Sequence, residues 1–338
     1  MCPERSAETL ARPLVLSLRD RAMASDVSVT AHWDTSTEPP AGGTRKAMLM
    51  RAMEVFHAVE AACTRFDPHS PLMRANSEGG AWHEVPRECF LALCEAERAH
   101  RVTGGRFDPR VLGDLVRLGY DSNLRFTGQS ARSLVELPPR ERRLPVPPRP
   151  PWRLDTIASR HRVRIGPEPV DLGGIGKGLA VRWAAAELAS STDGFLVDAG
   201  GDIHCGGDAP GGGKWKVAVE DPIGDPDPVA VLALSDLACA TSSTRLRRWR
   251  EGGRTVHHLL DPRTGQPAGQ GLASVTVVGP DPAMAEVWAK AMFVEGLDRA
   301  GRLAASEDLA ALWVDVAGNA FLSSAMAPYI CWSRVALG

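Results

Sequence analysis

Hydrophobic and polar residues alternate in some stretches of the chain, whereas in others the hydrophobic residues recur three and four positions apart. Alternation with several valines predicts a strand over residues 26–33. Helical spacing predicts one helix over residues 45–66 and a second over residues 87–105, which ends at two glycines. Residues 107–121 then predict a turn followed by a short helix. The first part of the chain is therefore expected to be mainly helical after an initial strand.

The second half of the chain is richer in strands. Hydrophobic runs that end at glycine, aspartate or proline predict strands at residues 161–166, 194–201, 214–221, 228–235, 272–279 and 309–318. Helical patterns predict two helices, at residues 177–190 and 281–296. Because strands and helices do not follow a strict β-α-β order, the pattern favours an α+β fold.

The organisation expected from this pattern is one domain with two irregular segments. Residues 1–20 are expected to form a flexible N-terminal extension, and residues 21–338 the folded domain. Half of residues 138–151 are proline and several others are arginine, which is typical of an extended connector.

Composition narrows the class of protein. The 338 residues carry a net charge of −2 with both signs interspersed, and no basic block contains interleaved aromatic residues, so a nucleic-acid partner is not expected. The seven cysteines are scattered without a C-x-x-C pair, which argues against a disulfide framework or a zinc site. No signal-peptide pattern and no run of eighteen apolar residues occurs, so we expect a soluble cytoplasmic protein without a membrane partner.

A glycine-rich stretch, "VDLGGIGKG" at residues 170–178, is the strongest candidate for ligand chemistry. Its spacing excludes a P-loop, because Asp171 stands where the first glycine belongs and Gly178 follows Lys177 in place of Ser or Thr. It also excludes the dinucleotide fingerprint, because Leu179 takes the position of the third glycine. Glycines before a helix still suit phosphate binding by backbone N–H groups. The alternative is a tight strand-to-helix turn packed against a sheet.

Further motifs occur in a fixed order along the chain, together with this loop: "RFDPHSPLMRAN", "TGGRFDPRV", "LVDAGGDI", "ATSST", "HHLLDPRTGQPAG" and "SVTVVGPDPAMAEVWAKAMFVEG". This series, from about Met23 to Gly296, resembles the FAD:protein FMN transferase family, the ApbE-type flavin transferases. The resemblance implies an α+β fold of two interleaved subdomains with an FAD cleft between them. It also implies magnesium-dependent transfer of FMN from FAD to a serine or threonine hydroxyl of a target protein, through a phosphoester bond. Some relatives instead hydrolyse FAD to FMN and AMP.

The resemblance also implies roles for individual residues. His258 is the candidate base that deprotonates the acceptor hydroxyl, a task that suits a neutral histidine, and Asp261 is a second candidate catalytic residue in the turn that follows. The backbone carbonyl of Gly176 is a candidate magnesium ligand. The candidate FAD-binding residues are Met23, Ser70, Asn76, Asp108, Lys177, Thr241, Ser242 and Lys290.

The chain departs from the family pattern at the expected metal site. Relatives carry Asp and Thr four residues apart on a helix as ligands, whereas this chain has Glu286 and Lys290. Glu286 remains a candidate metal ligand, but a protonated lysine has no lone pair for a cation. Either the Lys290 ammonium replaces the metal at the pyrophosphate, or the two residues form an ordinary i,i+4 helix pair. Arg110 and Arg182 are expected to add positive charge near the phosphates.

Three functions follow from these observations. The first is an FMN transferase that acts on an acceptor flavoprotein. The second is a metal-independent oxidoreductase that keeps FAD intact and acts on a small molecule. The third is an FAD pyrophosphatase. FAD is the expected ligand in all three, and the binding of Mg2+ is left open by the lysine at position 290.

Overall fold

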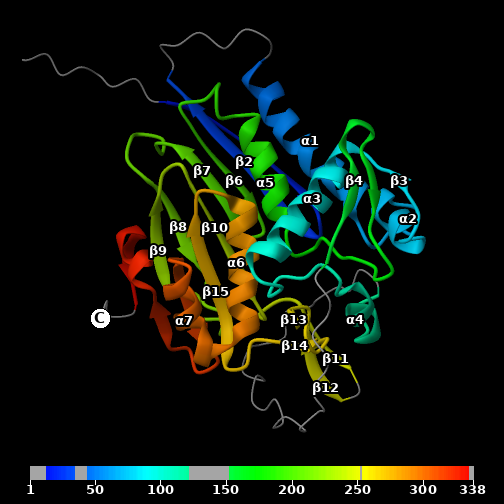
Figure 1. Cartoon of the computed structure of the whole chain (residues 1–338). Helices are drawn as coiled ribbons and strands as arrows, with labels where there is room; N and C mark the ends of the chain where they lie inside the picture. The colour runs from blue at the N-terminus through cyan, green and yellow to red at the C-terminus, as the bar shows by residue number, and fades with distance from the viewer. Residues whose placement is uncertain (1–12, 35–43, 122–151, 252, 335–338) are drawn as a thin grey trace, which may run out of the picture.

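The computed structural model describes residues 13–34, 44–121, 152–251 and 253–334 (Figure 1). Its α-helices are α1 (Arg45–Cys63), α2 (Pro71–Ser77), α3 (Arg87–Val102), α4 (Leu112–Arg117), α5 (Gly176–Ala186), α6 (Pro282–Glu295) and α7 (Leu297–Ser306). Two 3-10 turns are η2 (Ala158–Arg160) and η3 (Ser324–Tyr329). In these residues no helix combines the length and the apolar character that crossing a bilayer requires.

The strands are β1 (Leu14–Ala22), β2 (Ser25–Trp33), β3 (His83–Glu84), β4 (Asp155–Ile157), β5 (Arg162–Arg164), β6 (Gly194–Ala199), β7 (Asp202–Gly207), β8 (Trp215–Val219), β9 (Ala230–Leu234), β10 (Leu237–Ser243), β11 (Arg248–Glu251), β12 (Arg254–His257), β13 (Leu260–Asp261), β14 (Gln266–Pro267), β15 (Leu272–Gly279), β16 (Ala310–Asp315), β17 (Ala320–Leu322) and β18 (Ile330–Ser333).

One eight-stranded antiparallel sheet organises the protein, in the order β1-β2-β6-β7-β10-β15-β16-β17. Helices α1, α5 and α6 lie side by side on one face of this sheet, as Figure 1 shows. The small β18-β9-β8 sheet packs on the opposite face, against β7, β10, β15 and β16. Because both faces of β16 are covered, all six of its residues are buried, which explains its unbroken hydrophobic run.

A two-residue turn joins β1 to β2. Ala22 pairs with Ser25, so Met23 and Ala24 form the turn, and both have positive φ angles, of 53° and 56°. Such a turn follows the right-handed twist of the strands but is normally built from Asn or Gly. The backbone N–H of Met23 donates to Glu60 Oε1 on α1 at 2.9 Å, which holds the turn against that helix.

The fold class and the elements expected from the sequence patterns are confirmed at all the ranges given above. The expectation of a flexible extension over residues 1–20 is wrong for residues 14–20, which form most of edge strand β1. Most side chains of β1 are exposed, so its hydrophobic pattern is weak. The proline-rich segment 138–151 lies outside the described residues.

Candidate active site

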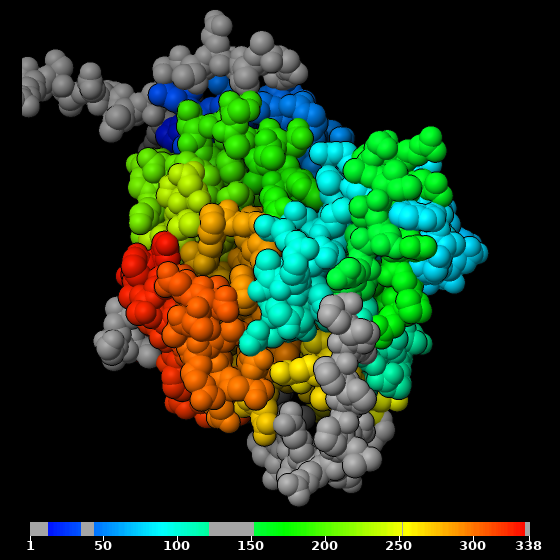
Figure 2. Space-filling model, in the orientation of Figure 1, coloured from blue at the N-terminus to red at the C-terminus, as the bar shows by residue number. Residues whose placement is uncertain are grey.

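A cleft opens beside the start of α5 and has an empty volume of about 1220 Å³ with its mouth included. Segments far apart in the sequence form its wall. Figure 2 shows a face of the molecule on which part of residues 87–121 lies against α6 and α7. The main wall segments are the β1–β2 turn, the end of α1, residues 106–120, the glycine loop, residues 247–262 and Lys290 of α6.

The glycine loop is held by neighbouring segments. The side-chain amide of Asn76 donates to the carbonyl of Val170 and accepts from its N–H, both at 2.9 Å, and so fixes the chain just before the loop. The residue before α5, Ile175, does not cap the helix, and Glu286 of α6 accepts from the N–H of Gly178 instead. The first turn of α5 still carries partial positive charge next to the cleft. A Cβ on Gly178 would lie 2.6 Å from the backbone of Ala283, so only glycine permits this approach of α5 to α6.

Lys177 lies at the centre of a buried charge cluster. Its ammonium forms ion pairs with Asp202 and, at 3.4 Å, with Glu286. Burial opposes its charge, but these two carboxylates outweigh burial and raise the pKa of Lys177. Burial also raises the pKa of Asp202 to about 6, against the opposite effect of Lys177. Glu286 accepts a further hydrogen bond from the N–H of Gly178 at 2.9 Å. The cluster thus ties β7, α5 and α6 together.

Lys290 enters the cleft from α6, above the glycine loop. A Cβ on Gly174 would lie 2.7 Å from Lys290 Nζ, so the glycine makes room for the ammonium. Burial lowers the pKa of Lys290, although the charge of Glu286 acts in the opposite direction. Within the described residues no ion pair joins Lys290 to Glu286 or to any other carboxylate. The ordinary i,i+4 helix pair considered from the sequence is therefore not what forms.

His258 is the cleft residue best suited to accept a proton. Its Nδ1 lies 3.3 Å from the carbonyl oxygen of Arg247, which can only accept, so Nδ1 carries the hydrogen and Nε2 has the free lone pair. Burial lowers the pKa of His258 well below its usual range, and the charges of Arg247 and Lys290 lower it further. The imidazole is therefore neutral near pH 7 and its lone pair is available as a base.

The neighbouring His257 points to the other side of its strand and packs edge-to-face on Phe293. Burial lowers the pKa of His257 to about 4, so the folded protein binds fewer protons than the unfolded chain between about pH 4 and pH 6.5. Stability is therefore expected to fall as pH falls through this window, by at most roughly 3 kcal/mol for this group. Replacing His257 by leucine should make the pH dependence of the unfolding free energy shallower, as measured by urea titration at a series of pH values.

His69, which is exposed, provides the control for this measurement. The His69→Leu variant should keep the pH dependence of the wild-type protein. The His257→Leu variant should still show part of this pH dependence, because the pKa of His258 is also lowered. Equal slopes for wild type and His257→Leu would show that His257 is not protonated on unfolding.

The donors around the expected metal position do not fit a magnesium ion. Gly176 is the first residue of α5, and its carbonyl keeps one lone pair beside the helical hydrogen bond, but Glu286 is already shared between Lys177 and the N–H of Gly178. Lys290 offers an ammonium in place of an oxygen. Among the described residues no group of three or more His, Cys, Asp or Glu side chains is placed to hold a metal.

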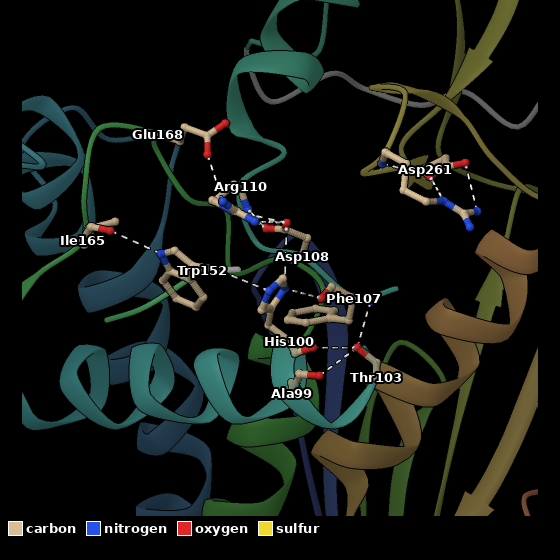
Figure 3. Close-up of polar contacts among 11 residues, drawn as sticks. Ala99, His100, Thr103, Phe107, Asp108, Arg110, Trp152, Ile165, Glu168 and Asp261 are labelled. Atoms are coloured by element: carbon tan, nitrogen blue, oxygen red, sulfur yellow. Dashed lines mark hydrogen bonds and ion pairs between the residues drawn. The ribbon is translucent and has the colours of Figure 1, made fainter. Parts of the chain in front are cut away.

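Asp108 lies in the cleft wall, but its carboxylate is occupied (Figure 3). It accepts hydrogen bonds from the backbone and the guanidinium of Arg110, at 2.6–3.2 Å, and Arg110 also pairs with Glu168 at 3.0 Å. Arg182 pairs with Asp281 and Glu95. The expectation that Arg110 and Arg182 add positive charge at the phosphates is therefore wrong, because carboxylates outside the glycine loop neutralise both.

The other predicted residues lie outside the described cleft wall. Ser70 caps α2 and donates to the carbonyl of Thr64 at 2.6 Å, and Thr241 shares a hydrogen bond with Thr276 at 2.8 Å. Ser242 is buried in β10. The Asp261 carboxylate holds the β13–β14 turn by accepting from the backbone and guanidinium of Arg263 (Figure 3). These contacts give Asp261 a structural task in the turn, and its catalytic role stays a prediction of the family resemblance.

Three further residues of the site were not predicted. Asp202 is the main partner of Lys177, Arg247 reaches the cleft beside His258, and Asp171 pairs with Arg65 at 2.9 Å in the cleft wall. The motif "LVDAGGDI" contains Asp202, but no spacing rule links it to a lysine 25 residues earlier. The sequence therefore indicates that this segment belongs to the site, but it does not indicate that Asp202 pairs with Lys177.

Together these features define an α+β protein whose cleft is built to bind a phosphorylated ligand and to take up a proton beside it. The chain belongs to the ApbE family, whose family model matches residues 23–313. It is 28% identical over 288 residues to the FAD:protein FMN transferase of Haemophilus influenzae, covering 81% of this chain and 80% of that protein. The same-named protein of Klebsiella pneumoniae is 27% identical, covering 82% and 85%.

Solved structures agree with this assignment. The ApbE protein of Thermotoga maritima superimposes with a TM-score of 0.77 at 25% identity, over 94% of this chain and 99% of that one. The flavin transferase ApbE of Vibrio cholerae has the same fold, with a TM-score of 0.72 at 23% identity and the same coverage.

Proposed function

We propose that this protein transfers the FMN half of FAD to a serine or threonine hydroxyl of an acceptor protein. The observation that carries the proposal is the presence, in one cleft, of a neutral histidine and an anion site made of the glycine loop, the start of α5 and Lys290. The names of the relatives, FAD:protein FMN transferase, support the same reaction.

The reaction assigns a task to each group. Nε2 of His258 removes the proton of the acceptor hydroxyl as its oxygen attacks the phosphorus of the FMN half. The bond from that phosphorus to the bridging oxygen breaks, and AMP leaves with this oxygen. Negative charge develops on the phosphoryl oxygens and on the leaving oxygen. The positive end of α5 and the ammonium group of Lys290 are placed to stabilise it, whereas Lys177 is already paired with Asp202 and Glu286.

The test is to incubate the full chain with FAD and candidate acceptor flavoproteins, and to follow both products. We expect a covalent FMN adduct on a serine or threonine, detected by mass spectrometry, with one AMP released per adduct. Release of free FMN and AMP without an adduct would instead indicate the pyrophosphatase. If the incubation yields no adduct and no AMP, the proposal is contradicted.

The oxidoreductase alternative finds no support among the relatives, whose names describe transfer. Magnesium as a participant stays a prediction of the family resemblance, and the donor set described above does not favour it. The cytoplasmic location also stays a prediction from the sequence, which fractionation of cells that express the full-length protein would test.

A further inference from the structure

Two cations in the cleft have no carboxylate partner among the described residues. Lys177 is paired with Asp202 and Glu286, and Arg65 with Asp171, but Lys290 and Arg247 form no ion pair with any residue that the structure describes. Both of these side chains line the cleft, and both act electrostatically on His258. They therefore lie near the group that accepts the proton in the proposed reaction.

Keeping an ammonium in a partly buried position without a counterion costs free energy. The half-buried position of Lys290 nevertheless has room for it, because the missing side chain of Gly174 leaves space for Nζ. A cation held in this way indicates that an anionic ligand completes the site. The charge also matches, since a pyrophosphate diester carries two negative charges and Lys290 and Arg247 provide two positive charges.

We propose that Lys290 and Arg247 together neutralise the pyrophosphate of FAD in place of a divalent metal ion, so that this protein binds FAD without magnesium. The inference rests on the proposed function for the identity of the ligand. It explains why the donors near Glu286 do not form a metal site, because the ammonium of Lys290 occupies the space above the glycine loop and Glu286 is held by α5.

Direct side-chain contacts differ from a metal ion in their geometry. An ammonium directs up to three hydrogen bonds at phosphate oxygens, and a guanidinium can contact two oxygens at once. Magnesium demands an octahedral set of oxygen ligands and retains several waters. The site should therefore bind the pyrophosphate in a conformation fixed by α6 and by residue 247, without bridging waters on a metal.

The test is to measure the dissociation constant of FAD for the full chain by isothermal titration calorimetry, once in excess EDTA and once in excess magnesium. We expect the same constant in both. Lys290→Met should weaken FAD binding in EDTA by about 10- to 100-fold, the effect expected for losing a charge-assisted hydrogen bond. Lys290→Arg should retain most of the affinity. Riboflavin, which lacks phosphate, should bind wild type and Lys290→Met equally.

The matched control is Lys216→Met, which replaces an exposed lysine on β8 that does not line the cleft, and this variant should bind FAD as the wild type does. A large loss of wild-type affinity in EDTA would overturn the inference, as would unchanged FAD binding by Lys290→Met. The EDTA comparison uses the unaltered chain, so it stands even if a variant fails to fold. If FAD binds equally in EDTA but no FMN is transferred, the proposed function fails while this inference stands.

Discussion

Replacing His258 by glutamine is expected to slow FMN transfer by about 10²- to 10⁴-fold, the usual contribution of a general base. Glutamine retains polarity and similar size but has no basic nitrogen. The dissociation constant of FAD should be unchanged, because His258 acts on the acceptor hydroxyl, whereas Lys290, Arg247 and the start of α5 bind the pyrophosphate. Both quantities are measured on the same preparation, the rate from covalent flavin and the affinity by calorimetry.

His69→Gln is the control for this variant, because its side chain is exposed. It should transfer FMN at the wild-type rate. A His258→Gln variant that keeps the wild-type rate would show that His258 takes no part in the reaction. A loss of both rate and FAD affinity would show that His258 binds FAD instead of acting as the base.

Replacing Lys177 by methionine is expected to destabilise the fold by roughly 3–5 kcal/mol, the usual effect of removing one partner from a buried ion pair. Asp202 and Glu286 would then lie buried without their ammonium. The loss should shrink as pH falls. Burial already raises the pKa of Asp202 to about 6 with Lys177 in place, and removing the lysine raises it further, so protonation relieves the charge. Urea titration at two pH values measures both effects.

The double variant Lys177→Met/Asp202→Asn tests whether the unpaired carboxylate causes this loss. It should recover part of the stability, because the buried carboxylate becomes a neutral amide. A single Lys177→Met variant as stable as wild type would show that the charge cluster does not hold β7, α5 and α6 together.

The sequence predicted the site best where a residue lies at the end of an element. The residues that do line the cleft are Met23, Asp108, Gly176, Lys177, His258 and Lys290. Each lies at a turn, a helix end or the cleft-facing side of a helix, where local pattern limits the direction of the side chain. Ser70 and Asn76 lie beside this set but hold backbone instead, Ser70 as a helix cap and Asn76 at the start of the glycine loop.

Pairing between distant segments could not be predicted in this way. Arg110 looked like a free cation in the sequence, and only the folded chain brings Glu168 within 3.0 Å of it. The pairing of Asp202 with Lys177 could not be predicted for the same reason, because only the folded chain brings the two residues together. Among the elements, β10 was missed because its residues are mostly small, and α7 because it follows α6 directly after Gly296. Local pattern identifies elements, whereas ion pairs depend on which elements become neighbours.

The β1–β2 turn has a consequence for how the protein is synthesised. Met23 lies in the cleft wall opposite segments that are made much later, since α6 supplies Lys290. The wall of the cleft is therefore incomplete on a nascent chain until α6 has left the ribosome. Until then Lys177 lacks its partner Glu286, and the charge cluster is exposed to water. Because a ligand that binds only the finished cleft stabilises the native state, FAD would act late, by trapping chains that are already complete.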